Sequence, residues 1–109
     1  MDKWFRQGDV IITRISAEEY ENLHLPHKND LVIAFGEATG HHHKLQAKAG
    51  QAQVLVNPKS QEAQAFSVKG ETKLVHEEHK TLSIPKGYYK VEFEKEYEPL
   101  EQLERRVYD

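Results

Sequence analysis

LVIAFGEATGHHHKLQ, residues 31–46, combines an apolar run, a glycine-containing turn and three consecutive histidines. The run at 31–36 ends in glycine and is typical of a short buried strand. Residues 41–46 alternate in character and predict a second strand. Short strands bounded by turn residues favour an all-β protein.

The rest of the chain repeats this pattern of short strands separated by turn residues. Ser16, with Glu19 three residues later, predicts a short helix near 16–23. The expected strands are 8–15, 52–57, 63–68, 72–76, 81–85 and 88–97. We therefore expect an all-β fold, a small single-domain barrel or sandwich spanning 1–109, with a C-terminal tail at 99–109.

Composition excludes several classes of function. The 109 residues contain no cysteine, which removes disulfides, thiolate metal sites and cysteine nucleophiles. The net charge of −3 argues against broad binding of duplex nucleic acid. No apolar stretch is long enough for a membrane helix or a signal peptide, so we expect a cytoplasmic protein of a prokaryote or a phage-infected host. Seven histidines are the compositional anomaly.

The parity of the strand at 41–46 predicts which histidines point inward. Alternate side chains of a strand face opposite sides, so His41 and His43 share a face with Leu45. Lys44 lies on the other face, which is therefore the solvent-exposed one. The triple histidine then acts as an inward H-x-H pair with His42 between.

A second cluster, HEEH at 76–79, lies before the strand at 81–85. If the alternation of the apolar residues in this segment continues, His76 and Glu78 lie on the inner face. His79 joins them only if a β-bulge shifts the phase, and bulges often re-aim side chains next to active sites. Glu78 and His79 thus remain alternatives for the next inward position.

Inward imidazoles from two segments suit a divalent metal such as Zn, Mn, Fe or Ni. We predict His41, His43 and His76 as ligands, with one coordination position left for water or substrate. The alternative is that both clusters are solvated surface features, with HEEH as an exposed, salt-bridged edge.

Short motifs along nearly the whole chain resemble a family of small, uncharacterised prokaryotic and phage proteins. The resemblance supports the histidine segments as the site and implies no reaction. It is carried by QGDV (7–10), GEATGHHHKL (36–45), HEEH (76–79), IPKGYY (84–89), EKEY (94–97) and RRVYD (105–109).

The chain also resembles the cupin superfamily of metal-binding β-barrels at the level of the fold. Cupins have a glycine, then H-x-H and a carboxylate, and a second P-x-G motif followed by histidine. Here Gln46 stands near the carboxylate position, and Lys90 follows Pro85-Lys86-Gly87 where the histidine would fall. A cupin-type site would lose a ligand in each motif, so the HEEH histidines would have to substitute.

These residues suggest a small metal-dependent phosphodiesterase or nuclease acting on a nucleotide or RNA-like substrate. The metal would activate a bound water, with Glu78 or His79 as general base or acid. An anionic substrate would be held by side chains that can contact phosphate oxygens. The candidates are Arg105, Arg106, Tyr88 and Lys44.

Other functions remain open from the sequence. Paired histidines without a metal can cleave RNA by acid–base chemistry. A non-enzymatic module that binds a ligand or protein, and a cupin-like oxygenase or isomerase, fit the same residues. Pairing through an exposed edge strand such as 88–97 would give a homodimer.

Overall fold

The structure, a computed structural model, describes residues 4–35 and 40–94. Most of these residues lie in β-strands, as expected, and a single short helix follows the second strand. The elements are β1 (Trp4–Gln7), β2 (Val10–Ile15), α1 (Ala17–Glu21), β3 (His27–Lys28), β4 (Val32–Phe35), β5 (His42–Gln46), β6 (Ala52–Val56), β7 (Ala63–Val68), β8 (Thr72–Val75), β9 (Leu82–Ile84) and β10 (Gly87–Phe93).

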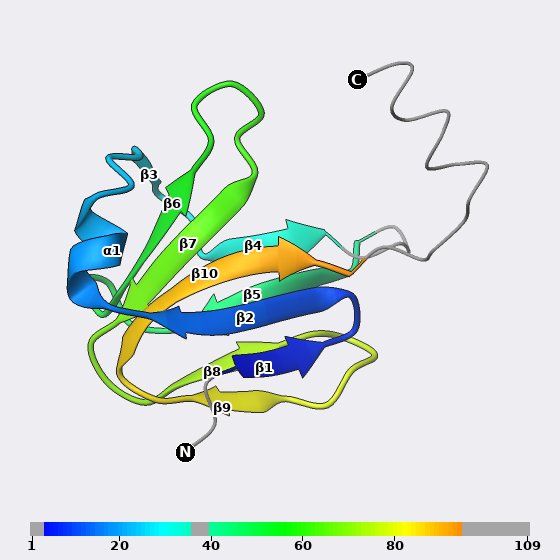
Figure 1. Cartoon of the computed structure of the whole chain (residues 1–109). Helices are drawn as coiled ribbons and strands as arrows, with labels where there is room; N and C mark the ends of the chain where they lie inside the picture. Colours follow the sequence, from blue (N-terminus) through cyan, green and yellow to red (C-terminus); the bar gives the residue numbers. More distant parts are fainter. Residues whose placement is uncertain (1–3, 36–39, 95–109) are drawn as a thin grey trace.

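The strands form two antiparallel sheets (Figure 1). The six-stranded sheet has the order β1-β2-β10-β7-β6-β3, and the four-stranded sheet has the order β4-β5-β8-β9. The two sheets are separate, so the protein is not a closed barrel. Of the two expected architectures, the barrel is therefore corrected to a two-sheet arrangement.

One apolar core is shared by both sheets. Ile12 and Phe66 of the six-stranded sheet are fully buried, as are Leu74 and Ile84 of the four-stranded sheet. Tyr89 of β10 lies in the same core and donates a hydrogen bond from its hydroxyl to Pro85 O at 2.6 Å. Burial of these faces holds the two layers together.

Most expected elements are present with shifted ends. The segment 63–68 is a strand over its full expected length, and the Ser16 hydroxyl accepts a hydrogen bond from Glu19 N–H at 3.0 Å, as an N-cap should. Two short strands, β1 and β3, were not expected. The predicted strand 88–97 is described only to Glu94, and the predicted C-terminal tail lies outside the described residues.

A bulge in β4 interrupts the alternation of its side chains between the two faces of the sheet. Val32 pairs with Lys44 while Ala34 pairs with His43, so one extra residue lies between them. Ile33 and Ala34 are consequently both buried, and Phe35 turns outward with 81% of its surface exposed. The segment 31–36 is therefore not buried throughout, because a bulge re-aims the side chains that follow it.

The strand expected to be an exposed edge is an inner strand. β10 pairs with β2 on one side and with β7 on the other, so its backbone groups are already bonded along most of its length. Within the described residues the sheet edges are β1, β3, β4 and β9. Edge pairing through 88–97 is thus corrected. In the same part of the chain, no helix has the length and apolar character needed to cross a membrane.

Candidate functional site

Three segments that are distant in sequence meet at one end of the two sheets. The start of β5, the loop between β8 and β9, and the turn between β1 and β2 surround a pocket of about 410 Å³. Its lining comprises Gly8, Asp9, Val10, Phe35, His41, His43, His76, Glu78, His79 and Phe93. The pocket therefore contains four imidazoles and two carboxylates.

The imidazoles are neighbours in space. The ring centres of His43 and His76 are 4.3 Å apart, and those of His76 and His79 are 4.6 Å apart. His43 lies 5.9 Å from His79, and His41 lies 5.8 Å from His76. The two histidine clusters of the sequence thus form a single group.

His43 is the most buried member of this group. Only 4% of its surface is exposed, because β5 places it on the core side with Leu45. Its Nδ1 lies 2.8 Å from Gln7 Oε1, while Gln7 Nε2 donates to Leu74 O at 2.8 Å and to Lys80 O at 2.9 Å. These two hydrogen bonds identify which end of the Gln7 amide is nitrogen. The Gln7 oxygen therefore faces His43 and accepts its Nδ1–H. Nε2 of a neutral His43 then carries a lone pair.

His43 is neutral at physiological pH. Burial, reinforced by repulsion from His76 and His79, lowers the pKa of the imidazole to about 4, although Asp9 and Glu77 act in the opposite direction. A neutral ring with its proton fixed on Nδ1 can bind a metal or accept a proton through Nε2. Gln7 is therefore the residue that fixes the chemical form of His43.

The three candidate site residues of the β8–β9 loop all lie in the same pocket. β8 ends at Val75, so the strand parity expected at 76–79 does not apply. His76 Nδ1 accepts a hydrogen bond from Glu78 N–H at 3.0 Å. The Glu78 carboxylate lies 3.6 Å from His41 Nδ1. His76, Glu78 and His79 all line the pocket, which removes the choice between Glu78 and His79.

Gly8 makes room for His79. Gly8 has φ +59°, a conformation that favours glycine, and a Cβ built there would lie 2.6 Å from His79 Nε2. The exposed His79 ring therefore lies directly over the β1–β2 turn. A side chain at position 8 would displace it.

His42 is turned away from the pocket, as the parity of β5 predicts. Its backbone N–H donates to Glu77 Oε1 at 3.0 Å, and its ring lies 3.7 Å from the second oxygen of the same carboxylate. The pKa of Glu77 is lowered, chiefly by the hydrogen bond from His42 N–H. This pair links β5 to the β8–β9 loop outside the pocket.

Two of the predicted substrate-binding residues, Tyr88 and Lys44, lie away from the histidines. Tyr88 is half-buried against Tyr20 of α1, with ring centres 4.9 Å apart, in a separate apolar cluster. Lys44 is exposed on the outer face of β5. Neither lines the histidine pocket. Arg105 and Arg106 lie outside the described residues.

Sequence reasoning missed four residues of this region: Gln7, Asp9, Phe35 and Phe93. The QGDV motif contains the first two, but its spacing gives no sign that β1 reaches the histidines. Phe35 and Phe93 look like core residues in a one-dimensional pattern. They are exposed because Phe35 follows the bulge and Phe93 ends β10.

The spacing of the rings, more than their present orientation, suits a metal ion. Two imidazoles that bind one zinc ion through bonds of about 2.1 Å have ring centres about 5 Å apart when the angle at the metal is tetrahedral. The observed separations of 4.3–5.9 Å bracket this value. As the side chains stand, no three His, Asp or Glu residues among 4–35 and 40–94 have the geometry to hold a metal ion. Binding would require rotation of rings such as the exposed His79.

Comparison with known proteins gives a family without an assigned activity. A family model described as Domain of unknown function (DUF8820) matches residues 6–94. No curated protein and no solved structure matches the chain. The match includes every residue of the histidine pocket and stops before Arg105 and Arg106. The chain therefore belongs to this uncharacterised family.

Proposed function

For this member of the DUF8820 family, we propose that the histidine pocket binds a divalent transition metal and hydrolyses a phosphoester, with a nucleotide or RNA-like substrate. The observation that carries the proposal is the convergence of four imidazoles beside Asp9 and Glu78 in one pocket. His41, His43 and His76 are the proposed ligands. A protein without cysteine thiols fits a reducing compartment, and we expect it in the cytoplasm.

The charge of the pocket favours a cation as the first occupant. Asp9 and Glu78 line it, and Glu77 lies next to it, while His43 is neutral. A phosphate would be repelled by these exposed carboxylates, and solvent weakens that repulsion without reversing its sign. A divalent ion reverses the sign of the field and makes phosphate binding favourable.

The surroundings of each residue suggest its role in the proposed reaction. Buried His43 offers Nε2 from a fixed ring, which preorganises one metal bond. His76 coordinates through Nε2 only if it gives up the hydrogen bond from Glu78 N–H, which costs about 1 kcal/mol and is small against the free energy of metal binding. A bound metal would lower the pKa of its water, and Glu78 or His79 would move the proton.

A second candidate is metal-free acid–base catalysis by His43 and His76. The Gln7 contact leaves a lone pair on Nε2 of His43, and the Glu78 N–H contact leaves a proton on Nε2 of a neutral His76. Two rings 4.3 Å apart then present a base and a hydrogen-bond donor, and His76 would become a general acid if a second proton on Nδ1 replaced the Glu78 N–H contact and made the ring an imidazolium. This candidate needs no metal, so chelation separates it from the first.

Elemental analysis and titration calorimetry with Zn²⁺, Mn²⁺, Fe²⁺ and Ni²⁺ test the metal site. We expect one ion per chain for the wild type and at least a tenfold loss of affinity in His43→Ala. His27→Ala, on the distant strand β3, is the matched control and should bind as the wild type does. Absence of binding for all four ions would refute the metal site.

Hydrolysis is tested with bis(p-nitrophenyl) phosphate and a short RNA, with and without chelator. Activity that chelator abolishes and the metal restores supports the metal-dependent hydrolase. Activity that survives chelation but is lost in His76→Ala supports the acid–base candidate. A protein that binds metal yet hydrolyses neither substrate contradicts the proposed reaction.

A further inference from the structure

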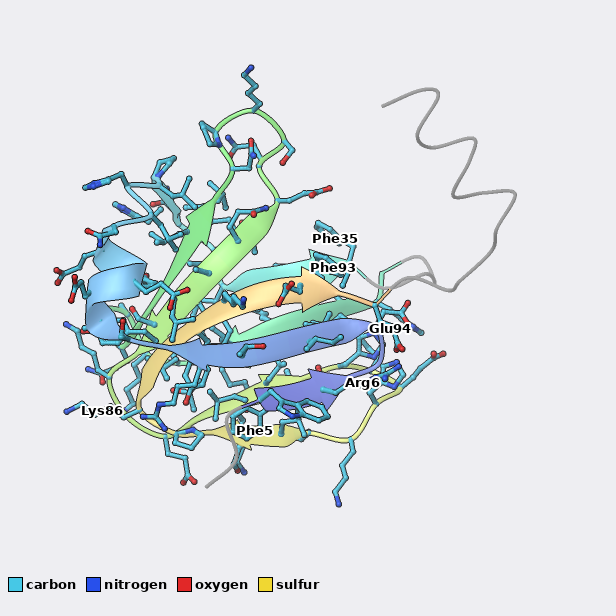
Figure 2. The ribbon with its side chains drawn as sticks, in the orientation of Figure 1. Phe5, Arg6, Phe35, Lys86, Phe93 and Glu94 are labelled. Atoms are coloured by element: carbon cyan, nitrogen blue, oxygen red, sulfur yellow. The ribbon has the colours of Figure 1, made fainter. Side chains whose placement is uncertain are left out.

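Two exposed aromatic rings stand at the rim of the histidine pocket. Phe35 is 81% exposed at the end of β4, and Phe93 is 42% exposed at the end of β10 (Figure 2). Neighbouring exposed rings beside a pocket offer apolar area that a bound ligand can bury favourably. The β4 bulge that turns Phe35 outward is a feature that other proteins use to re-aim side chains beside active sites.

The same two rings also form a wall of a second pocket. This pocket has a volume of about 660 Å³, a size suited to a small organic ligand. Its lining comprises Lys28, Val32, Ile33, Ala34, Phe35, Ser60, Gln61, Glu62, Ala63 and Phe93. The histidine pocket and the second pocket thus meet at Phe35 and Phe93; we call the two together the trough, with the histidine pocket as its histidine end and the second pocket as its largely apolar end.

One side of the apolar end is polar, and it is formed by a turn that Asn57 stabilises. Gln61 has φ +65°, a left-handed conformation that costs a non-glycine residue about 1 kcal/mol or more. Asn57 holds this turn: its side-chain oxygen accepts N–H groups of Lys59 and Ser60, and its carbonyl accepts Gln61 N–H at 2.8 Å. The Gln61 amide nitrogen donates to Pro58 O at 3.2 Å, so its carbonyl oxygen is the group that can accept a hydrogen bond from the edge of a ring in the apolar cavity.

We propose that the apolar end of the trough binds the planar base of a nucleotide, which stacks on Phe35 and Phe93 while the phosphoester reaches the histidines. This rests on the proposed function for the choice of a phosphoester at the other end. Stacking on aromatic side chains tolerates any base, because every base has a π-face. An aliphatic ligand would use the apolar wall but not the flat rings or the polar turn at Gln61.

Titration with adenosine, ribose 5-phosphate and cyclohexanol, followed by NMR of the metal-free protein, tests the subsite. We expect adenosine alone to shift the Phe35 and Phe93 signals. Phe35→Leu keeps an apolar side chain and should weaken adenosine binding about tenfold, whereas Phe35→Trp should retain it. Trp4→Leu is the control, because Trp4 is 60% exposed yet lines neither pocket.

The outcomes separate this subsite from the metal site. Adenosine binding that persists in His43→Ala supports the subsite even if that variant and the wild type bind no metal. Equal binding of adenosine by the wild type and Phe35→Leu overturns it, as does binding of cyclohexanol as tight as adenosine. Shifts at Phe35 and Phe93 in a ligand-free Leu100→Ser/Leu103→Ser variant would assign this surface to the chain's own C-terminal residues and also overturn it.

Discussion

Acid should destabilise this protein through His43. The pKa of this imidazole is 6.5 in an unfolded chain and about 4 in the folded protein. Between these values the unfolded chain binds more protons than the folded chain, so the free energy of unfolding falls as the pH falls. At about 1.4 kcal/mol per unit of pKa difference, lowering the pH from 7 to 4 removes about 3 kcal/mol. Below pH 4 both states are protonated, and the contribution of His43 levels off.

Urea denaturation followed by circular dichroism, in EDTA and at intervals between pH 7 and pH 4, measures this loss. Other groups also titrate, so the quantity of interest is the pH dependence of the difference between wild type and His43→Leu. We expect that difference to shrink by about 3 kcal/mol over the range. His24→Gln, which removes an exposed histidine outside the pocket, is the matched control. Parallel curves for wild type and His43→Leu would refute a buried, neutral His43.

Three further substitutions probe the supports of the site and the fold. Gln7→Leu leaves His43 N–H without an acceptor and should lower the free energy of unfolding by about 2 to 3 kcal/mol, measured by urea denaturation; no loss would mean that Gln7 does not hold His43. Gly8→Ala forces a side chain into a left-handed position against His79, so we expect a loss of about 1 to 2 kcal/mol and lower metal-dependent hydrolysis, and unchanged kinetics would contradict the role of His79. Ser16→Ala removes a helix cap and should cost about 1 kcal/mol in thermal denaturation while leaving metal affinity unchanged.

Local patterns in the sequence predict the strands and the direction of His43. Alternation in residues 41–46 places His43 beside Leu45 on the inner face, and both are buried. The helix start at Ser16 follows from the spacing of one hydroxyl and one glutamate. These features are local, since the strand period and the N-cap need only a few neighbouring residues.

The remaining features of the site depend on contacts between distant segments. Gln7 acts on His43 because β1 lies beside β2 at the edge of the sheet, which no local pattern of a four-residue strand reveals. Parity fails at His76 because the chain leaves β8 at Val75. The bulge before Phe35 is likewise set by the pairing of β4 with β5. Long-range pairing, not propensity, determines each of these positions.

The place of β10 within the six-stranded sheet has a consequence for biosynthesis. Phe93, near the end of the described chain, pairs with Val10 near its start, and β10 also pairs with β7. While the ribosome is still making the first eighty residues, the β1–β2 hairpin therefore has no neighbour to complete its sheet. Such non-local closure is slow, so the six-stranded sheet, whose β1 carries the Gln7 that holds His43, is completed after the four-stranded sheet that carries the imidazoles.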